Sequence, residues 1–277
     1  MVFNQQQFKT AFQEVGEQLS LHRDFPGIAQ PQGICLHTFE ILPSTNQMLW
    51  ELIDQGAVEG TVVMAAQQTA GRGQWGRQWQ SGQGGLYLSM ALSPNLQASN
   101  SAQLTLCSAW GIAKALRVYS IPVCLKWPND LLLLQRKLGG ILTETRVQQG
   151  QITKAVVGVG INWCNGVPES GINLQSFCEQ QLSSAVISLE MLTAIVLSGL
   201  LWGYQRWLKE GMERLLPSYL ELLDSQGCHV IVDGKPGIVT GVTPTGELRV
   251  SLKSLNSTEA ASEICLKPGT ISLGYRW

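Results

Sequence analysis

Charged residues are scarce in this 277-residue chain, at 14% against 44% hydrophobic residues. This balance excludes a disordered or fibrous chain and indicates a globular protein with well-filled sheets. The formal net charge is only −1, so no general attraction to nucleic acid or to an anionic membrane is expected. Since domains usually have ~100–200 residues, the length predicts one large domain and one small one.

The sequence also lacks paired cysteines, a secretion signal and a long apolar run. Its seven cysteines are scattered without a C-x-x-C pair, which predicts reduced thiols rather than a zinc or redox site. The N-terminal sequence carries Glu14 and Glu17 and has no apolar segment of the signal-peptide kind. The apolar run Ala194–Trp202 is well short of the ~20 residues of a membrane span. We therefore expect a cytoplasmic protein that does not contact a membrane.

Hydrophobic periodicity predicts an α+β fold with a mixed β-sheet. The expected helices are Phe3–Leu19, a helix that Ser44 opens with a capping-box pattern and that runs through Ile53, Ala102–Tyr119, Leu189–Glu210 and Glu213–Ser225. The expected strands are Ile34–Leu42, Thr61–Ala66, Leu86–Leu92, Val123–Leu125, Leu131–Leu134, Gly140–Arg146 and Lys154–Ile161, and Asn165–Ser184 is expected to be a loop.

Three regions follow from this pattern. Residues 1–33 form an N-terminal helix and a linker, Pro26–Gly33, and residues 34–226 form the main domain. From residue 227 to 277 the pattern changes to short strands with turns at Asp233-Gly234 and Pro244-Thr245-Gly246. This change predicts a small C-terminal β-barrel.

Acidic residues are missing altogether between Glu59 and Asp130. The same interval holds five basic residues, so its local charge is +5: Arg72, Arg77, Lys114, Arg117 and Lys126. Arginine forks and the backbone N–H groups of glycine-rich loops both bind phosphate or carboxylate oxygens. The interval therefore predicts an anion site, although an isolated Arg-Gly loop is more often only a solvated basic loop.

Within this interval, Gly71-Arg72-Gly73-Gln74-Trp75-Gly76 matches the G-x-G-x-x-G pattern of dinucleotide-binding folds. That pattern needs a helix directly after it and an acidic residue that binds ribose. The following residues, 77–85, are poor helix formers that lead into a strand, and the acid is missing. A dinucleotide-binding fold is therefore excluded.

Two further segments place a cation beside polar groups. Lys126-Trp127-Pro128-Asn129-Asp130 precedes a strand, and Arg136-Lys137-Leu138-Gly139-Gly140 suggests a tight hairpin turn that would bring Lys137 and Asp130 to the same hairpin. A fixed lysine can stabilise negative charge on a carboxylate or a phosphoryl group. Taken alone, each segment is explained as well by an exposed turn.

Five motifs together resemble the biotin protein ligase family in order and approximate spacing. They are Ser44-Thr45-Asn46, Gln68-Thr69-Ala70-Gly71-Arg72-Gly73, Lys126-Trp127-Pro128-Asn129-Asp130, Lys137-Leu138-Gly139-Gly140-Ile141-Leu142 and Gly158-Val159-Gly160-Ile161-Asn162. The resemblance is strong from Leu36 to Asn162 and weaker beyond. It implies a catalytic core related to class II synthetases, with a mixed sheet and helices on one side, and a C-terminal SH3-like barrel.

The resemblance also implies an activity. ATP would activate biotin as biotinyl-5′-AMP, and the biotin would then pass to a lysine of the biotin carboxyl carrier protein of acetyl-CoA carboxylase. ATP and biotin are thus the expected substrates, with Mg²⁺ as cofactor. The enzyme is expected to be a monomer or a homodimer without a nucleic-acid partner, because the opening helix is short and not basic, unlike the DNA-binding domain of bifunctional repressor forms.

The roles of individual residues come from the same resemblance. Lys137, Arg72 and Asp130 are the expected catalytic residues, and Asp130 is also the candidate metal ligand. Biotin would contact Ser44, Thr45, Asn46, Gln68, Arg72, Gly73, Gln74 and Lys137. The nucleotide would contact Gly71, Arg72, Trp79, Asn129, Lys137 and Asn162. Trp127 is expected to be a packing residue.

One position departs from the family and two alternatives stay open. The family usually has Gly-Arg-Gly-Arg where this chain has Gln74, which can donate a hydrogen bond but carries no charge. A lipoate or octanoate ligase-transferase of the same broad fold would use a similar lysine with a long apolar pocket. A catalytically inactive biotin-binding module is the other alternative, and the presence of Arg72, Asp130 and Lys137 argues against it.

Overall fold

The computed structural model describes residues 3–22, 25, 33–180, 186, 188–252, 262–271 and 273. Most of the expected linker, Pro26–Gly33, therefore lies outside the described residues. The helical elements are α1 (Gln5–Ser20), α2 (Thr45–Asp54), η1 (Gln74–Gly76), η2 (Ala98–Asn100), α3 (Ala102–Val118), α4 (Leu174–Gln180), α5 (Leu189–Glu210) and α6 (Met212–Leu220).

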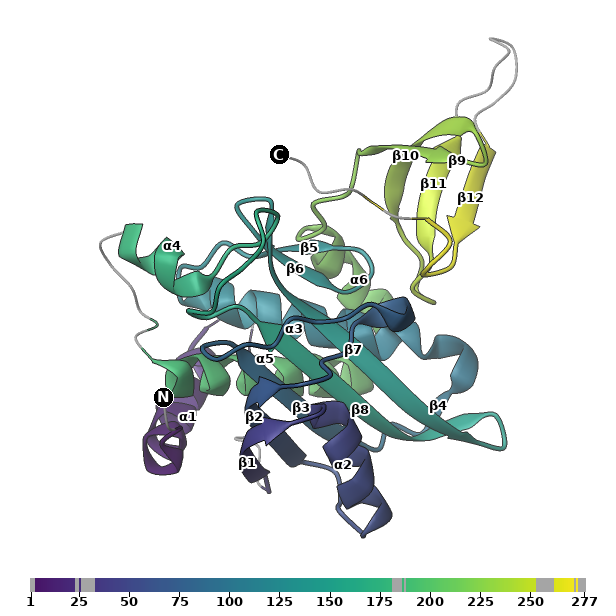
Figure 1. Ribbon diagram of the computed structural model, residues 1–277. Coiled ribbons are helices and arrows are strands. Elements are labelled where there is room, and N and C mark those ends of the chain that lie inside the picture. The colour runs from purple at the N-terminus through teal and green to yellow at the C-terminus, as the bar shows by residue number, and fades with distance from the viewer. Residues whose placement is uncertain are drawn as a thin grey trace.

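The main sheet has eight strands in the order β1-β2-β3-β8-β7-β6-β5, with β4 added against β8. Only β1 and β2 pair in parallel, and the other pairs are antiparallel, so the predicted mixed sheet is confirmed (Figure 1). Its strands are β1 (Cys35–Leu42), β2 (Thr61–Gln68), β3 (Leu86–Leu92), β4 (Leu96–Gln97), β5 (Cys124–Lys126), β6 (Asp130–Leu133), β7 (Arg136–Gln148) and β8 (Gln151–Ile161).

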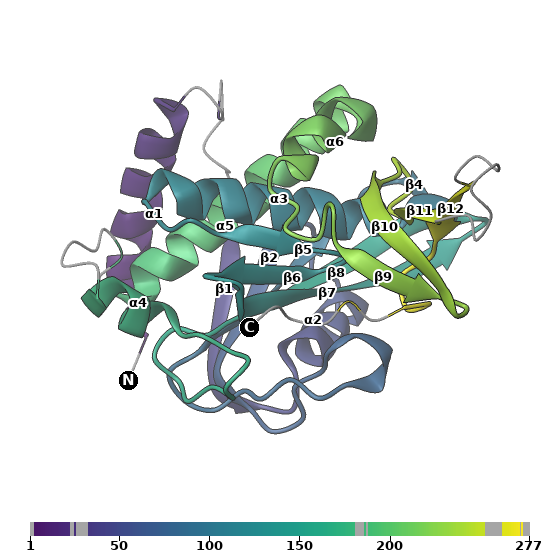
Figure 2. The ribbon, with the colours of Figure 1, turned by 90° about the horizontal axis from the view of Figure 1, so that it is seen from above.

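Helices cover both faces of this sheet, not one. Figure 2 shows α3 and α5 on one face and α2 on the other. Strand β2 explains the division, because Val62 and Met64 point into the large core with α3 and α5, whereas Val63 and Ala65 belong to a smaller cluster with α2. The face that carries α2 also carries the functional site.

The hairpin between β6 and β7 turns at a different place from the one the sequence suggested. Leu134 and Gln135 form the turn, both with positive φ (49° and 61°), and Leu133 pairs with Arg136. The predicted turn segment 136–140 is already part of β7. Its glycine Gly139 serves close packing instead, since a Cβ there would lie 2.6 Å from the carbonyl oxygen of Gly160.

Other expectations differ in detail. The segment Asn165–Ser184 was expected to be a loop, but α4 forms within it because the Asn173 side chain accepts a hydrogen bond from the N–H of Ser176 and Phe177 is buried. Residues 181–185 lie outside the described part. Helix α6 ends at Leu220 instead of Ser225. Helix α5 and strand β3 have the predicted bounds.

The C-terminal region forms a four-stranded antiparallel sheet in the order β12-β11-β10-β9. Its strands are β9 (His229–Val232), β10 (Lys235–Val242), β11 (Leu248–Leu252) and β12 (Ser262–Leu266). Both predicted turns are present, and the second one contacts the main domain: the Trp127 Nε1 donates to Gly246 O at 2.9 Å. The division at residues 226/227 and the SH3-like barrel remain predictions.

All seven cysteines are free thiols. No helix in the described ranges combines the length and the apolarity that crossing a membrane requires.

Candidate functional site

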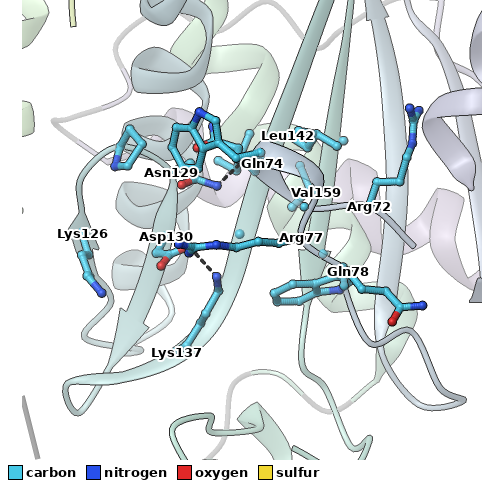
Figure 3. Close-up of a pocket in the computed structure, with 18 of the residues that line it drawn as sticks. Arg72, Gln74, Arg77, Gln78, Lys126, Asn129, Asp130, Lys137, Leu142 and Val159 are labelled. Carbon is cyan, nitrogen blue, oxygen red and sulfur yellow. Dashed lines mark hydrogen bonds and ion pairs between the residues drawn. The ribbon is translucent and has the colours of Figure 1, made fainter. Parts of the chain in front are cut away.

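A pocket of about 360 Å³ opens on the α2 face of the main sheet (Figure 3). Five segments line it: the β1–α2 junction, the end of β2 with the loop that follows, the β5–β6 hairpin with the start of β7, residues 140–142 of β7 with 158–160 of β8, and residues 269–271 and 273. Eleven predicted site residues are in this lining, namely Ser44, Thr45, Asn46, Gln68, Arg72, Gly73, Gln74, Trp79, Asn129, Asp130 and Lys137.

One end of the pocket is a network of buried polar side chains. The Thr45 N–H and hydroxyl both reach Gln68 Oε1, at 2.8 and 3.2 Å, and Ser89 donates to Asn46 Oδ1 at 2.6 Å. Ser44 precedes α2 as its N-cap, but its side chain makes no capping hydrogen bond, so the capping box is not formed. The network fixes groups that can exchange hydrogen bonds with a compact polar ring.

The glycine–arginine loop, residues 69–85, folds back on itself without forming a helix. Gly73 N donates to Arg77 O at 2.7 Å, and Trp79 N donates to Gly71 O at 2.9 Å. The only helical segment in this loop, all of which the structure describes, is the three-residue turn η1. The helix that a dinucleotide-binding fold requires after the glycines is therefore absent from the loop, as predicted. Gly71 does not line the pocket; a Cβ there would lie 2.4 Å from Ser81 Oγ and 2.5 Å from Trp79 O, so it permits a close chain crossing.

The other end of the pocket is basic. Lys137 Nζ lies 2.6 Å from Asp130 Oδ1, so the two residues do flank one hairpin and meet as an ion pair. Burial lowers the pKa of Lys126 to about 8; Asp130 opposes this shift, and the neighbouring charges of Lys137 and Arg77 add to it. Figure 3 shows Arg77 extending toward Asp130. Three cations around one carboxylate favour an anionic ligand here.

The two ends are close enough for one small ligand to bridge them. Asn46 lies against Gly158, which pairs with Leu142, whereas Lys137 lies beside Gly140, which pairs with Gly160. Leu142 and Gly140 are two residues apart on β7, or about 7 Å. This spacing matches a ligand in which a short apolar chain, about 7 Å long, connects a polar ring to an acidic group.

Trp79 closes one side of the basic end. Its ring lies 5.2 Å from Lys137 Nζ, and its buried Nε1 has no hydrogen-bond partner among the described residues. A Cβ on Gly160 would come within 2.5 Å of this Nε1, so glycine is needed for the indole to lie flat on β8. Trp127 is buried, as expected of a packing residue, although it also forms part of the lining.

Two predicted residues behave differently. Arg72 points away from the Lys137–Asp130 pair (Figure 3). It forms an ion pair with Glu144 at 3.0 Å. Asn162 is not part of the lining; its Nδ2 donates to the Lys137 carbonyl oxygen at 3.3 Å, behind the pocket. In this arrangement Asn162 supports the backbone of Lys137, and its expected contact with a nucleotide stays a prediction.

Several lining residues were not predicted from the sequence. Trp75 and Gln78 belong to the same loop, and their proximity to known motifs was the only available signal. Residues 269–271 and 273 come from beyond the C-terminal sheet, with Gly269 against the Trp75 indole. No local pattern in that segment indicates a pocket wall.

The lining fits a magnesium ion only as part of a nucleotide complex. The described residues contain no group of three or more His, Cys, Asp or Glu side chains that could hold a metal, and Asp130 is the one carboxylate in the described lining. Magnesium commonly binds proteins through one or two carboxylates together with substrate phosphates. Asp130, with Asn129 next to it in the lining, matches that pattern.

Comparison with known proteins gives a consistent result. Residues 38–162 match the Biotin/lipoate A/B protein ligase family. The Bifunctional ligase/repressor BirA of Salmonella typhimurium is 32% identical over 235 residues, which cover 82% of this chain and 72% of that protein. The Bacillus subtilis protein of the same name is 38% identical over 125 residues, or 44% of this chain, and the match spans only 38% of its length.

A solved structure supports the same relationship. The biotin protein ligase from Aquifex aeolicus in complex with biotin and ATP superimposes with a TM-score of 0.68 at 26% identity. The superposition covers 87% of this chain and 99% of that one.

Proposed function

This chain belongs to the biotin protein ligase family, and from that premise we propose that it activates biotin with ATP and transfers it to a lysine of the biotin carboxyl carrier protein of acetyl-CoA carboxylase. The observation that carries the proposal is that one pocket holds both the Lys137–Asp130 ion pair and a buried polar network. The strand residues beside these two groups, Gly140 and Leu142, are about 7 Å apart on β7. This spacing suits a ureido ring at Asn46 and a carboxylate at Lys137.

In the first step the biotin carboxylate attacks the α-phosphorus of ATP, the bond to the bridging oxygen breaks, and pyrophosphate leaves. Lys137 would neutralise charge on the carboxylate and then on the α-phosphate, and Lys126 and Arg77 lie close enough to add to the same field. Asp130 and Asn129 would hold magnesium together with the nucleotide phosphates, and the ion would add to the stabilisation of negative charge.

In the second step the carrier lysine nitrogen attacks the carbonyl carbon of the mixed anhydride, and AMP leaves. A free lysine is protonated at neutral pH, with a pKa of ~10.4, so the amine must lose a proton before it reacts. Asp130 is ion-paired with Lys137 and can accept a hydrogen bond from the incoming amine, which would orient it. Ser44, Thr45, Asn46 and Gln68 would hold the ureido ring, and Trp79 would cover the nucleotide.

The decisive experiment is pyrophosphate release from ATP with biotin, with lipoate or with neither. We expect release only with biotin, because the inner end of the pocket is polar rather than a long apolar channel. Lipoate-dependent release would instead assign the chain to the sister activity, and no release with either acid would leave an inactive binding module.

The lowered pKa of Lys126 predicts a pH dependence. A lysine is charged below its pKa, so the charge of Lys126 is present below about pH 8 and is lost above it. We expect kcat/KM for ATP to fall as the pH rises past about 8, because this ratio reports groups of the free enzyme. A Lys126→Arg variant, which stays charged, should lack the fall; an identical profile in both proteins would contradict the role of Lys126.

Gln74 predicts weaker retention of the adenylate than an arginine would give. Its amide can donate a hydrogen bond to the adenylate but carries no charge, unlike a guanidinium. Exchanging a charge-assisted bond for a neutral one costs on the order of 1 kcal/mol, or about five-fold. Biotinyl-adenylate should therefore leave the natural protein about five-fold faster than the Gln74→Arg variant in a chase experiment. Equal release rates would contradict this.

A further inference from the structure

Glu144 of β7 connects the glycine–arginine loop to the polar network, although no motif includes it. Both its oxygens bind the Arg72 guanidinium, at 3.0 and 3.1 Å, in a forked pair. The same carboxylate accepts hydrogen bonds from Asn46 Nδ2 at 3.0 Å and from Trp50 Nε1 at 3.2 Å. One side chain thus contacts the glycine–arginine loop and the polar network through α2.

Charge explains why this carboxylate matters to the loop. The interval between Glu59 and Asp130 has five positive charges and no negative one, so the loop cannot neutralise Arg72 from within itself. Glu144 supplies that charge from 72 residues away, and its side chain is 26% exposed, which limits screening by solvent. Forked arginine–carboxylate pairs fix orientation as well as distance.

We infer that Glu144 is a positioning residue that holds Arg72 and the glycine–arginine loop in place and at the same time fixes Asn46 in the polar network. The contribution of Glu144 to catalysis rests on the proposed function. Its effect on the loop can be measured without any substrate. Glu144→Gln removes the charge but keeps an oxygen for Asn46 and Trp50. Glu144→Ala removes all these contacts.

The first measurement is tryptic cleavage after the exposed Arg77, without substrates. We expect about five-fold faster cleavage in Glu144→Gln, the effect of losing one well-formed, partly exposed ion pair. In an Arg72→Gln background the same change should cause no further acceleration, since the partner is gone. Asp54→Asn is the matched control, because it removes the Asp54–Arg146 pair between the same two elements, α2 and β7, without touching the loop.

The second measurement is biotin affinity by calorimetry. Glu144→Gln should stay within about two-fold of the natural protein, whereas Glu144→Ala should weaken binding about ten-fold, as expected when a buried hydrogen-bonding group loses its partner. Cleavage of Glu144→Gln at the natural rate, equal acceleration by Asp54→Asn, or unchanged affinity in Glu144→Ala would overturn the inference. If the natural protein bound no biotin, the proposed function would fail. The cleavage rates of the Glu144→Gln and Arg72→Gln single and double variants would still decide whether Glu144 holds the loop.

Discussion

Replacing Lys137 with alanine is expected to lower the rate of biotin-dependent pyrophosphate release by at least about 100-fold, the usual effect of removing one preorganised charge from a transition state. The ammonium group lies where the acid and the α-phosphate would meet, and it is held there by Asp130 at 2.6 Å and by the Trp79 ring. Removal also leaves Asp130 without its ion pair, so negative charge would repel the incoming phosphate.

Initial rates at saturating ATP and biotin measure this loss. Lys154→Ala is a suitable control, because Lys154 lies on β8, outside the pocket lining, and hydrogen-bonds Ser93. Lys137→Arg keeps the charge but changes its geometry and should lie between the natural protein and Lys137→Ala. An alanine variant with more than a tenth of the natural rate would rule out Lys137 as the principal cation of the activation step.

Replacing Gly111 with alanine is expected to destabilise the fold by about 3 kcal/mol, at the upper end of the range for overpacked cores. Gly111 of α3 faces Gly199 and Gly203 of α5 where the two helices cross. A Cβ on Gly111 would lie 2.1 Å from the Gly199 carbonyl oxygen and 2.8 Å from the Gly203 Cα. These are backbone atoms, so the helices themselves must move apart.

The midpoint of urea unfolding measures the effect, and about 3 kcal/mol is a large part of the ~5–15 kcal/mol stability of most domains. Gly166→Ala is the matched control, since a Cβ there meets nothing within 4 Å and its backbone is not in the positive-φ region. Equal midpoints for the two variants would mean that the helices can separate at little cost.

Local patterns were sufficient to predict most elements. A short β-prone apolar run identified Leu86–Leu92, and helical periodicity identified Leu189–Glu210, with the bounds that the structure has. The hairpin at Leu134-Gln135 was misplaced because its two residues are not typical of turns, while the neighbouring glycines are. Those glycines are present for close contact between strands, which depends on neighbours far along the chain.

The kinds of elements and the chemistry of the motifs were predictable from the sequence, because periodicity, charge and glycine content act over a few residues. Which groups meet depends on the folded chain: Arg72 pairs with Glu144, and Asn162 lies behind Lys137. Residues 269–271 and 273 complete the pocket lining, with Gly269 against Trp75. These contacts depend on sheet register and on how distant segments close over one another. Such long-range pairing is set by the packing of the whole chain, so no short stretch of sequence specifies it.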